Sequence, residues 1–384
     1  MIALARIERS AHHERGERGM IGRWWWTVDR WTLIALVLLA AVGAILTMAA
    51  GPSAAQRIGL DPMHFVRHQF LFLGPALIVM FAVSLLSPTL VRRIGVLGFV
   101  IGFGLLALTL LVGNDVKGAS RWIVLAGITI QPSEFVKPCL AITAAWMLAL
   151  HRESPGFPGR LIAVALYIVV CGILVLQPDF GMTMVAGAIG FVQLFLAGLP
   201  LIWVLVAVGG TLGFGYGAYA LLPHVASRID RHLNPESGDT YQTDISIRAL
   251  EAGGLFGRGP GEGAVKNLLP DSHTDFVFAV AGEELGLLAC LGIVGLFAFI
   301  VLRGFTRALK DSNLFVVLAV SGLLTQFGLQ ALVNMGVTVR LLPAKGMTLP
   351  FVSYGGSSLI ATAFAMGMVL ALTRERAPEW RAAA

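Results

Sequence analysis

Asp275 is the carboxylate best placed for chemistry in this sequence. It lies in the stretch PDSHTDFVFAVAGEELG, Pro270 to Gly286, where a polar, glycine-rich segment leads into a long apolar run. A carboxylate beside an apolar groove can act as a general base when its pKa lies in a useful range. Taken alone, Asp275 would more often be a helix-cap residue. Glu283 and Glu284 follow about 12–14 Å further along a helix, where they can bond to neighbouring helices or to water in a cavity.

Candidate cations lie in three other polar clusters and in the glycine-rich segment before Asp275. Arg121 follows GAS in GASRWI, Lys137 ends QPSEFVK, Arg258 lies in GGLFGRGPGEG, and Lys345 lies in LLPAKGMTLPFVSYGGSSL. Cations near a carboxylate can neutralise a phosphate leaving group. A lipid-borne pyrophosphate substrate would need both the base and the cations.

Each cluster also has a structural interpretation. Glu134 and Lys137 are three residues apart and can pair on one helix face, either as a functional pair or as a snorkelling anchor of the helix end. Asp179, in LQPDFGM, is interpreted first as a helix cap. The glycines of residues 253–263 can present backbone N–H groups to a phosphate, or form a flexible lid.

The composition is that of a membrane protein. Of 384 residues, 57% are hydrophobic and 13% are charged, whereas a soluble domain has about 45–50% apolar and about 25% charged residues. The three cysteines lie in apolar stretches without metal-type spacing, so neither a disulfide nor a zinc site is expected. Most basic residues flank apolar runs, so the net charge of +6 reflects membrane topology and not binding to nucleic acid.

The positioning elements are membrane-spanning helices, each of which needs about 20 apolar residues. Apolar runs predict an all-α polytopic protein with about ten spans, at residues 31–50, 66–86, 93–113, 132–150, 161–177, 180–198, 201–222, 274–303, 312–337 and 353–373. The predicted domains are an N-terminal tail (1–30), a single membrane domain (31–373) and a C-terminal tail (374–384). A large outer loop, about 223–273, separates helices 7 and 8 and includes a short interfacial helix in TDISIRALEAGG.

The motifs resemble those of the SEDS proteins (shape, elongation, division and sporulation). HTDFVFAVAGEELG, QPSEFVKP, LQPDFG, GGLFGRG and LLPAKGMTLPFVSYGGSSL carry the resemblance, which covers nearly all the chain beyond about residue 30. MTLPFVSYGGSS and WWWTVDRW look more like the division members than the elongation members. The resemblance implies a ten-helix inner-membrane protein at the division septum that polymerises lipid II. It also implies a class B penicillin-binding protein (an FtsI-type transpeptidase) and other division proteins as partners.

The resemblance also implies roles for individual residues. Asp275 matches the catalytic aspartate of the family, and Lys345 the lysine of its P-x-K-G motif. Further substrate-binding positions are expected at Arg121, Lys137, Glu134, His273 and Ser357. Met182 departs from the family pattern, which has threonine at this position. No cofactor is certain, although a divalent cation, Mg²⁺ or Mn²⁺, is compatible with a pyrophosphate leaving group.

Two other functions remain open at this stage. A lipid II flippase would make use of buried Glu283 and Glu284, because intramembrane carboxylates serve transport paths. A non-catalytic scaffold for division proteins would not need Asp275 together with Lys345.

The distribution of charge gives a prediction for topology. With the N-terminus in the cytoplasm, sixteen Lys and Arg residues lie on the inner side and seven in the short outer loops and nearby helix ends. The positive-inside rule therefore places both termini in the cytoplasm. A reporter that is active only in the cytoplasm should work when fused after Arg307 and fail when inserted near Ser237. The opposite pattern would place Asp275 on the wrong side.

Overall fold

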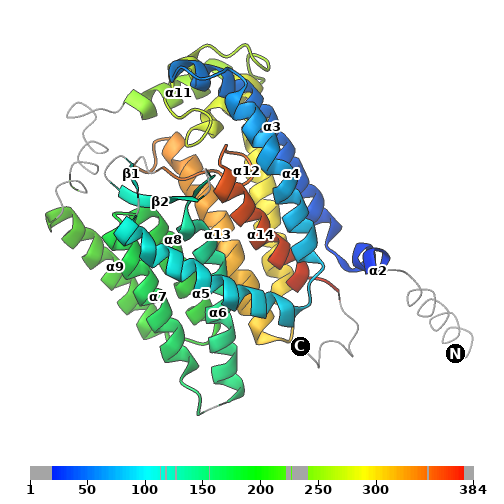
Figure 1. Cartoon of the computed structure of the whole chain (residues 1–384), viewed down its shortest axis with the longest axis vertical. Coiled ribbons are helices and arrows are strands. Elements are labelled where there is room, and N and C mark those ends of the chain that lie inside the picture. Colours follow the sequence, from blue (N-terminus) through cyan, green and yellow to red (C-terminus); the bar gives the residue numbers. More distant parts are fainter. Residues whose placement is uncertain are drawn as a thin grey trace, which may run out of the picture.

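The protein is a bundle of long helices capped at one end by a loop region that contains a short helix. The computed structural model describes residues 20–112, 114–116, 119–125, 128–154, 156–221, 226, 241–343 and 346–375. The long helices run side by side, with α11 (Tyr241–Gly253) at one end and the chain's C-terminus toward the other (Figure 1). We call these the outer end and the inner end of the bundle.

All ten predicted spans are helices. They are α3 (Arg30–Arg57), α4 (His64–Ser84), α5 (Pro88–Val112), α6 (Pro132–Glu153), α7 (Gly159–Leu176), α8 (Phe180–Leu196), α9 (Leu201–Leu221), α12 (Val277–Ala308), α13 (Leu314–Thr338) and α14 (Gly356–Leu372). Within the described residues, seven helices are long and apolar enough to cross a membrane, and α8 and α14 are shorter apolar helices of 17 residues each.

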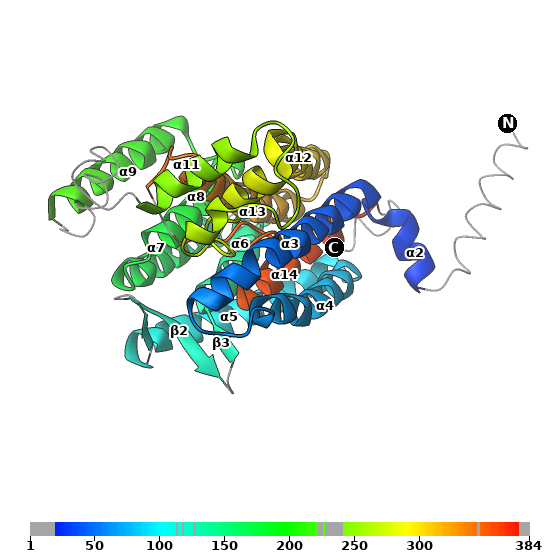
Figure 2. The ribbon, with the colours of Figure 1, turned by 90° about the horizontal axis from the view of Figure 1, so that it is seen from above.

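Helices α6 and α13 form the centre of the bundle. In their apolar windows 78% and 72% of the residues are buried, against 28% in α4, α5, α7 and α12. Seen from above, the other helices surround these two (Figure 2). Polar side chains on α6 and α13 are therefore shielded from lipid.

Two elements were not predicted. Strands β1 (Asn114–Val116), β2 (Ala119–Leu125) and β3 (Ile128–Ile130) form a small antiparallel sheet between α5 and α6, in the order β1-β2-β3. Helix α2 (Met20–Thr27) lies in the predicted N-terminal tail, where Trp24 is buried and its indole Nε1 donates to Ser84 Oγ at 2.9 Å. Trp25, Trp26 and Trp31 are exposed, as expected of an interfacial aromatic belt.

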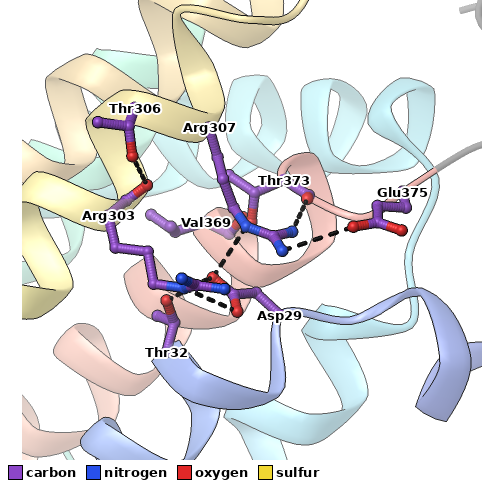
Figure 3. A network of polar contacts seen from close by, with 8 residues as sticks. All are labelled: Asp29, Thr32, Arg303, Thr306, Arg307, Val369, Thr373 and Glu375. Carbon is purple, nitrogen blue, oxygen red and sulfur yellow. Dashed lines mark hydrogen bonds and ion pairs between the residues drawn. The ribbon is translucent and has the colours of Figure 1, made fainter.

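A buried carboxylate ties three helices together at the inner end (Figure 3). Asp29 precedes α3 and accepts hydrogen bonds from Arg303 Nε, at 2.7 Å, and from Thr32. Arg307 lies 3.1 Å from the same carboxylate and also contacts Glu375 beyond α14. Burial alone would raise the pKa of Asp29, but the bonds from Arg303 and Thr32 and the arginine charges outweigh it and lower the pKa. These contacts hold the start of α3, the end of α12 and the end of α14 together.

At the outer end, α12 is interrupted at Gly286. Gly286 has φ +82° and ψ 178°, a conformation that favours glycine. The preceding segment is buried, whereas Leu287, Leu288 and Leu291 beyond it are exposed on the lipid-facing side. The 32 residues of α12 would extend about 48 Å, more than the ~30 Å hydrocarbon core. The lipid-exposed part of α12 therefore begins after Gly286.

The glycine-rich loop packs against this interruption. Arg258 N and Gly259 N donate to the carbonyls of Glu283 and Glu284, both at 3.0 Å, and Leu287 N donates to Gly254 O at 2.9 Å. A Cβ at Gly257, where φ is +81°, would lie 2.1 Å from Glu284 O, so this close approach requires glycine. The phosphate-binding interpretation is wrong at Arg258 and Gly259, because their N–H groups are already bonded.

Glu283 and Glu284 hold the same loop through their side chains. The two carboxylate oxygens of Glu283 accept from Val265 N and Lys266 N, each at 2.7 Å, at the start of the 3-10 helix η2 (Val265–Leu268). Glu284 pairs with the buried Lys266 ammonium. Of the two predicted kinds of partner, neighbouring helices or cavity water, the structure shows the first, because both carboxylates bind residues of η2 in the outer loop.

We predict that neutralising the buried Glu283 lowers the stability of the protein more than neutralising an exposed carboxylate of the same loop. Glu283→Gln leaves one oxygen and places an NH₂ group against a backbone donor, which costs about 1–3 kcal/mol of unfolding free energy. We expect a lower midpoint of thermal unfolding in detergent. Glu262→Gln, which alters an exposed carboxylate of the same loop, should change the midpoint little. Equal midpoints for the two variants would contradict this role.

Candidate functional site

Asp275 lies in a turn, residues 271–276, immediately before α12. Its side chain is half-buried and its backbone N–H donates to Asp271 O at 3.1 Å. The N-cap position of α12 is occupied by Phe276, one residue further on. Asp275 therefore does not hold the N-cap position itself.

Three consecutive carbonyl groups fix this turn. His273 O accepts from Tyr354 N at 2.9 Å, Thr274 O accepts from Ser353 Oγ, and Asp275 O accepts from Asn334 Nδ2 at 2.9 Å. The donors come from α13 and from the segment that precedes α14. The backbone of Asp275 is therefore positioned by two parts of the chain that are distant in sequence.

The motif that contains Lys345 lies against Asp275. A Cβ at Gly346 would be 3.2 Å from Asp275 Oδ2, so the backbone at Gly346 is next to the carboxylate. Asn334 Nδ2 also donates to Met347 O at 2.6 Å, which joins the two motifs. Lys345 itself lies outside the described residues, and the prediction that it binds substrate stays a prediction.

His273 is packed in an aromatic cluster. Its ring stacks on Phe65 of α4 with centroids 4.1 Å apart, and Tyr354 lies 5.5 Å away. Only 9% of its surface is exposed, and Nδ1 is buried with no hydrogen-bond partner among the described residues. Burial lowers the pKa of His273 from 6.5 to about 4, although the charge of Asp271 opposes this shift. A neutral ring that supports the turn is the role this geometry favours, and substrate contact by His273 stays a prediction.

Glu134 and Lys137 form the predicted pair, but deep inside the bundle. Lys137 Nζ lies 3.0 Å from Glu134 Oε2, and the residues are 1% and 2% exposed. The snorkelling interpretation is wrong, because the ammonium does not reach the surface. Lys137 Nζ also lies 3.0 Å from the sulfur of Met182 and 3.4 Å from Gln330 Oε1. Met182 thus contributes a weak acceptor to this site.

Two residues of α13 connect this pair to the turn, and sequence reasoning missed both. Gln330 contacts Lys137 and donates to Thr348 O at 3.4 Å, while Asn334, one helical turn later, bonds Asp275 and Met347. Polar residues four apart in an otherwise apolar helix indicate an internal polar stripe. Gln326, Gln330 and Asn334 are spaced four residues apart, and this pattern in the sequence could have indicated the stripe.

Arg121 contacts the turn between α7 and α8, whereas Ser357 lies at the start of α14. Arg121 Nε lies 3.6 Å from Asp179 Oδ2 and 3.4 Å from Gln177 O, at the turn between α7 and α8. Asp179 also accepts from Met182 N at 3.3 Å, which confirms that it caps α8. Ser357 is half-buried in the first turn of α14, next to Ser358, whose hydroxyl lies 3.3 Å from Thr348 Oγ1.

The described residues do not offer a three-ligand metal site. No group of three His, Cys, Asp or Glu side chains in this part of the chain could hold a metal ion. Asp275 would supply one carboxylate ligand, and Mg²⁺ commonly binds through one or two carboxylates together with substrate phosphates, so the expected divalent cation stays a prediction. We therefore derive no step through a metal.

The pKa of His273 predicts how stability depends on pH. The unfolded chain takes up a proton on this histidine near pH 6.5, but the folded protein does so only near pH 4, so acidification between these values destabilises the fold. His273→Phe keeps a ring against Phe65 and cannot be protonated. We expect its thermal midpoint to fall less steeply from pH 6.5 to pH 4 than that of the wild type. Measurements at pH 8 give the baseline, and parallel curves would contradict the prediction.

Comparison with known proteins shows the same architecture and sequence pattern. Residues 30–377 match the profile of the FtsW/RodA/SpoVE family of cell cycle proteins. A probable peptidoglycan glycosyltransferase FtsW of Caulobacter vibrioides is 43% identical over 367 residues, covering 94% of this chain and 93% of that protein. One from Trichlorobacter lovleyi is 35% identical over 352 residues, covering 88% and 91%.

Solved structures of related proteins have the same fold. A chain from a study of how a peptidoglycan synthase complex coordinates polymerization and crosslinking is 30% identical, with a TM-score of 0.76 over 90% of this chain and 97% of that chain. The rod shape determining protein RodA of Thermus thermophilus is 30% identical, with a TM-score of 0.67 over 91% and 97%. This multi-pass membrane protein therefore belongs to the FtsW/RodA/SpoVE family of cell cycle proteins, the SEDS family, and is most like FtsW.

Proposed function

We propose that this protein is a peptidoglycan glycosyltransferase that polymerises lipid II into β-1,4-linked glycan strands during cell division. The observation that carries the proposal is the turn at Asp275, whose three carbonyl bonds fix a half-buried carboxylate at the outer end of the bundle. The relatives named peptidoglycan glycosyltransferase FtsW support the reaction class.

The chemistry needs one base. Lipid II carries an α-linked pyrophosphate and the product is β-linked, so a single inversion at the anomeric carbon is sufficient. The Asp275 carboxylate accepts the proton of the acceptor 4-hydroxyl while the oxygen of that hydroxyl forms a bond to the anomeric carbon of the donor. The bond from that carbon to the pyrophosphate oxygen breaks, and its electrons leave with undecaprenyl pyrophosphate. A glycoside hydrolase needs a second carboxyl group because its leaving group must be protonated, whereas pyrophosphate leaves as an anion.

The cations divide between leaving-group and supporting roles in this proposal. Lys345, next to Gly346, is the cation for the departing pyrophosphate. Lys137 is neutralised by Glu134 and positions Gln330 and, through it, Thr348. Arg121 binds the turn at Asp179 and lies at the edge of the site.

The cellular setting follows from the same proposal. A class B penicillin-binding protein of the FtsI type is the partner, supported by the likeness to a peptidoglycan synthase complex. The protein spans the inner membrane at the septum as one domain, residues 31–373, with both termini in the cytoplasm. The flippase alternative drew on Glu283 and Glu284, which here hold the loop and η2 in fixed contacts.

The base is tested by replacing Asp275 with its amide. Asp275→Asn keeps the size of the side chain but removes its basicity, and general base catalysis contributes about 10²–10⁴-fold. We expect glycan formation from lipid II, by purified protein with its transpeptidase partner, to fall by at least about 10²-fold.

The matched control is Asp271→Asn in the same turn, which we expect to retain most of the activity. Equal product from Asp275→Asn and the wild type would remove Asp275 as the base. No glycan from a folded wild-type complex would favour transport or a scaffold over polymerisation.

A further inference from the structure

A basic cavity lies at the inner end of the bundle, on the opposite side from Asp275. Its volume is about 250 Å³, and it is lined by Leu148, His151, Arg152, Arg160 and Ala197. These residues come from the end of α6, the start of α7 and the residue after α8. Three helix ends therefore converge on one concave site that the proposed glycosyltransferase reaction does not use.

The two arginines of this cavity have no carboxylate partner among the described residues. Arg152 is exposed, Arg160 is half-buried, and neither takes part in an ion pair within the described ranges. Glu153, the neighbouring acidic residue, does not line the cavity. Arg303 and Arg307 at the same end are instead neutralised by Asp29. The cavity thus holds two guanidinium groups that no carboxylate pairs with in the described part of the chain.

Apolar side chains lie beside the charged ones, both in the lining of the cavity and on the neighbouring helix surface. Leu148 and Ala197 line it together with the charged side chains. Leu161, the residue after Arg160, is 70% exposed, and Phe195, two residues before Ala197, is 51% exposed. Exposed apolar side chains of a membrane helix face hydrocarbon. Acyl chains can therefore pack beside the bundle while a charged headgroup occupies the cavity.

We propose that this cavity binds the phosphate group of an anionic phospholipid of the cytoplasmic leaflet. Guanidinium groups bind phosphate oxygens through paired, charge-assisted hydrogen bonds. Basic pockets between transmembrane helices on the cytoplasmic side suit such headgroups. The bound lipid holds the inner end of α6, the helix whose outer part carries Glu134 and Lys137. The inner end faces the cytoplasm by the charge asymmetry of the sequence.

The test measures lipid-dependent stability of the full-length protein. Purified wild type in detergent micelles is titrated with phosphatidylglycerol, with net-neutral phosphatidylcholine, and separately with inorganic phosphate, and thermal unfolding is followed. Phosphatidylglycerol should raise the midpoint by mass action, and phosphatidylcholine should not. In the double variant Arg152→Gln with Arg160→Gln, the concentration for half of the effect should rise at least about tenfold.

Two further variants make the result specific. Arg93→Gln removes an exposed arginine of α5 that does not line the cavity and should respond like the wild type. Arg152→Lys with Arg160→Lys keeps both charges without the paired geometry, should bind with intermediate affinity, and serves if the Gln variant does not fold. An unchanged response of both double variants would overturn the proposal. An equal effect of inorganic phosphate would assign the site to a free anion instead of a lipid.

Discussion

Charged side chains inside the bundle must be neutralised by the protein itself, and the rest of the structure depends on this constraint. Neither hydrocarbon nor a packed core supplies a counter-charge, so an unpaired ion there is strongly unfavourable. Lys137 is paired with Glu134, Lys266 with Glu284, and Asp29 with Arg303 and Arg307. The Glu134–Lys137 pair joins α6 to α13 through Gln330, and the Lys266–Glu284 pair joins the outer loop to α12. The Asp29 cluster joins the start of α3 to the ends of α12 and α14. Because a lone partner would be costly, a helix that carries one member of a pair must keep its position relative to the other member.

Helix α12 shows how this fixing serves the site. Its inner end is held by Asp29, and its outer segment is held by the loop that Glu283 and Glu284 bind. The turn with Asp275 lies directly before that outer segment. The interruption at Gly286 lets the buried segment pack under the loop while the remainder faces lipid. One long helix thus combines a membrane span with a support for the carboxylate.

Local patterns in the sequence predicted much of this arrangement, and long-range contacts account for what it did not. The ten spans followed from apolar length, the Glu134–Lys137 pair from spacing on one helix, and α11 from the segment TDISIRALEAGG in the outer loop. The sheet and the partners of Glu283 depend on which segments meet in space. Likewise, no local pattern links Asn334 to the carbonyl of Asp275, because 59 residues separate them. For Lys345 and Ser357 the motif alone indicates a role.

The bonds at the turn act on backbone carbonyls, and this choice has a consequence for catalysis. A general base must lie within about 2.6–3.2 Å of the proton it accepts, so small displacements matter. Tyr354 N, Ser353 Oγ and Asn334 Nδ2 restrain residues 273–275 through main-chain oxygens. These three donors therefore position the backbone around Asp275 and do not bind its carboxylate oxygens. Since the donors belong to α13 and to the segment before α14, a shift of either element would move the proposed base.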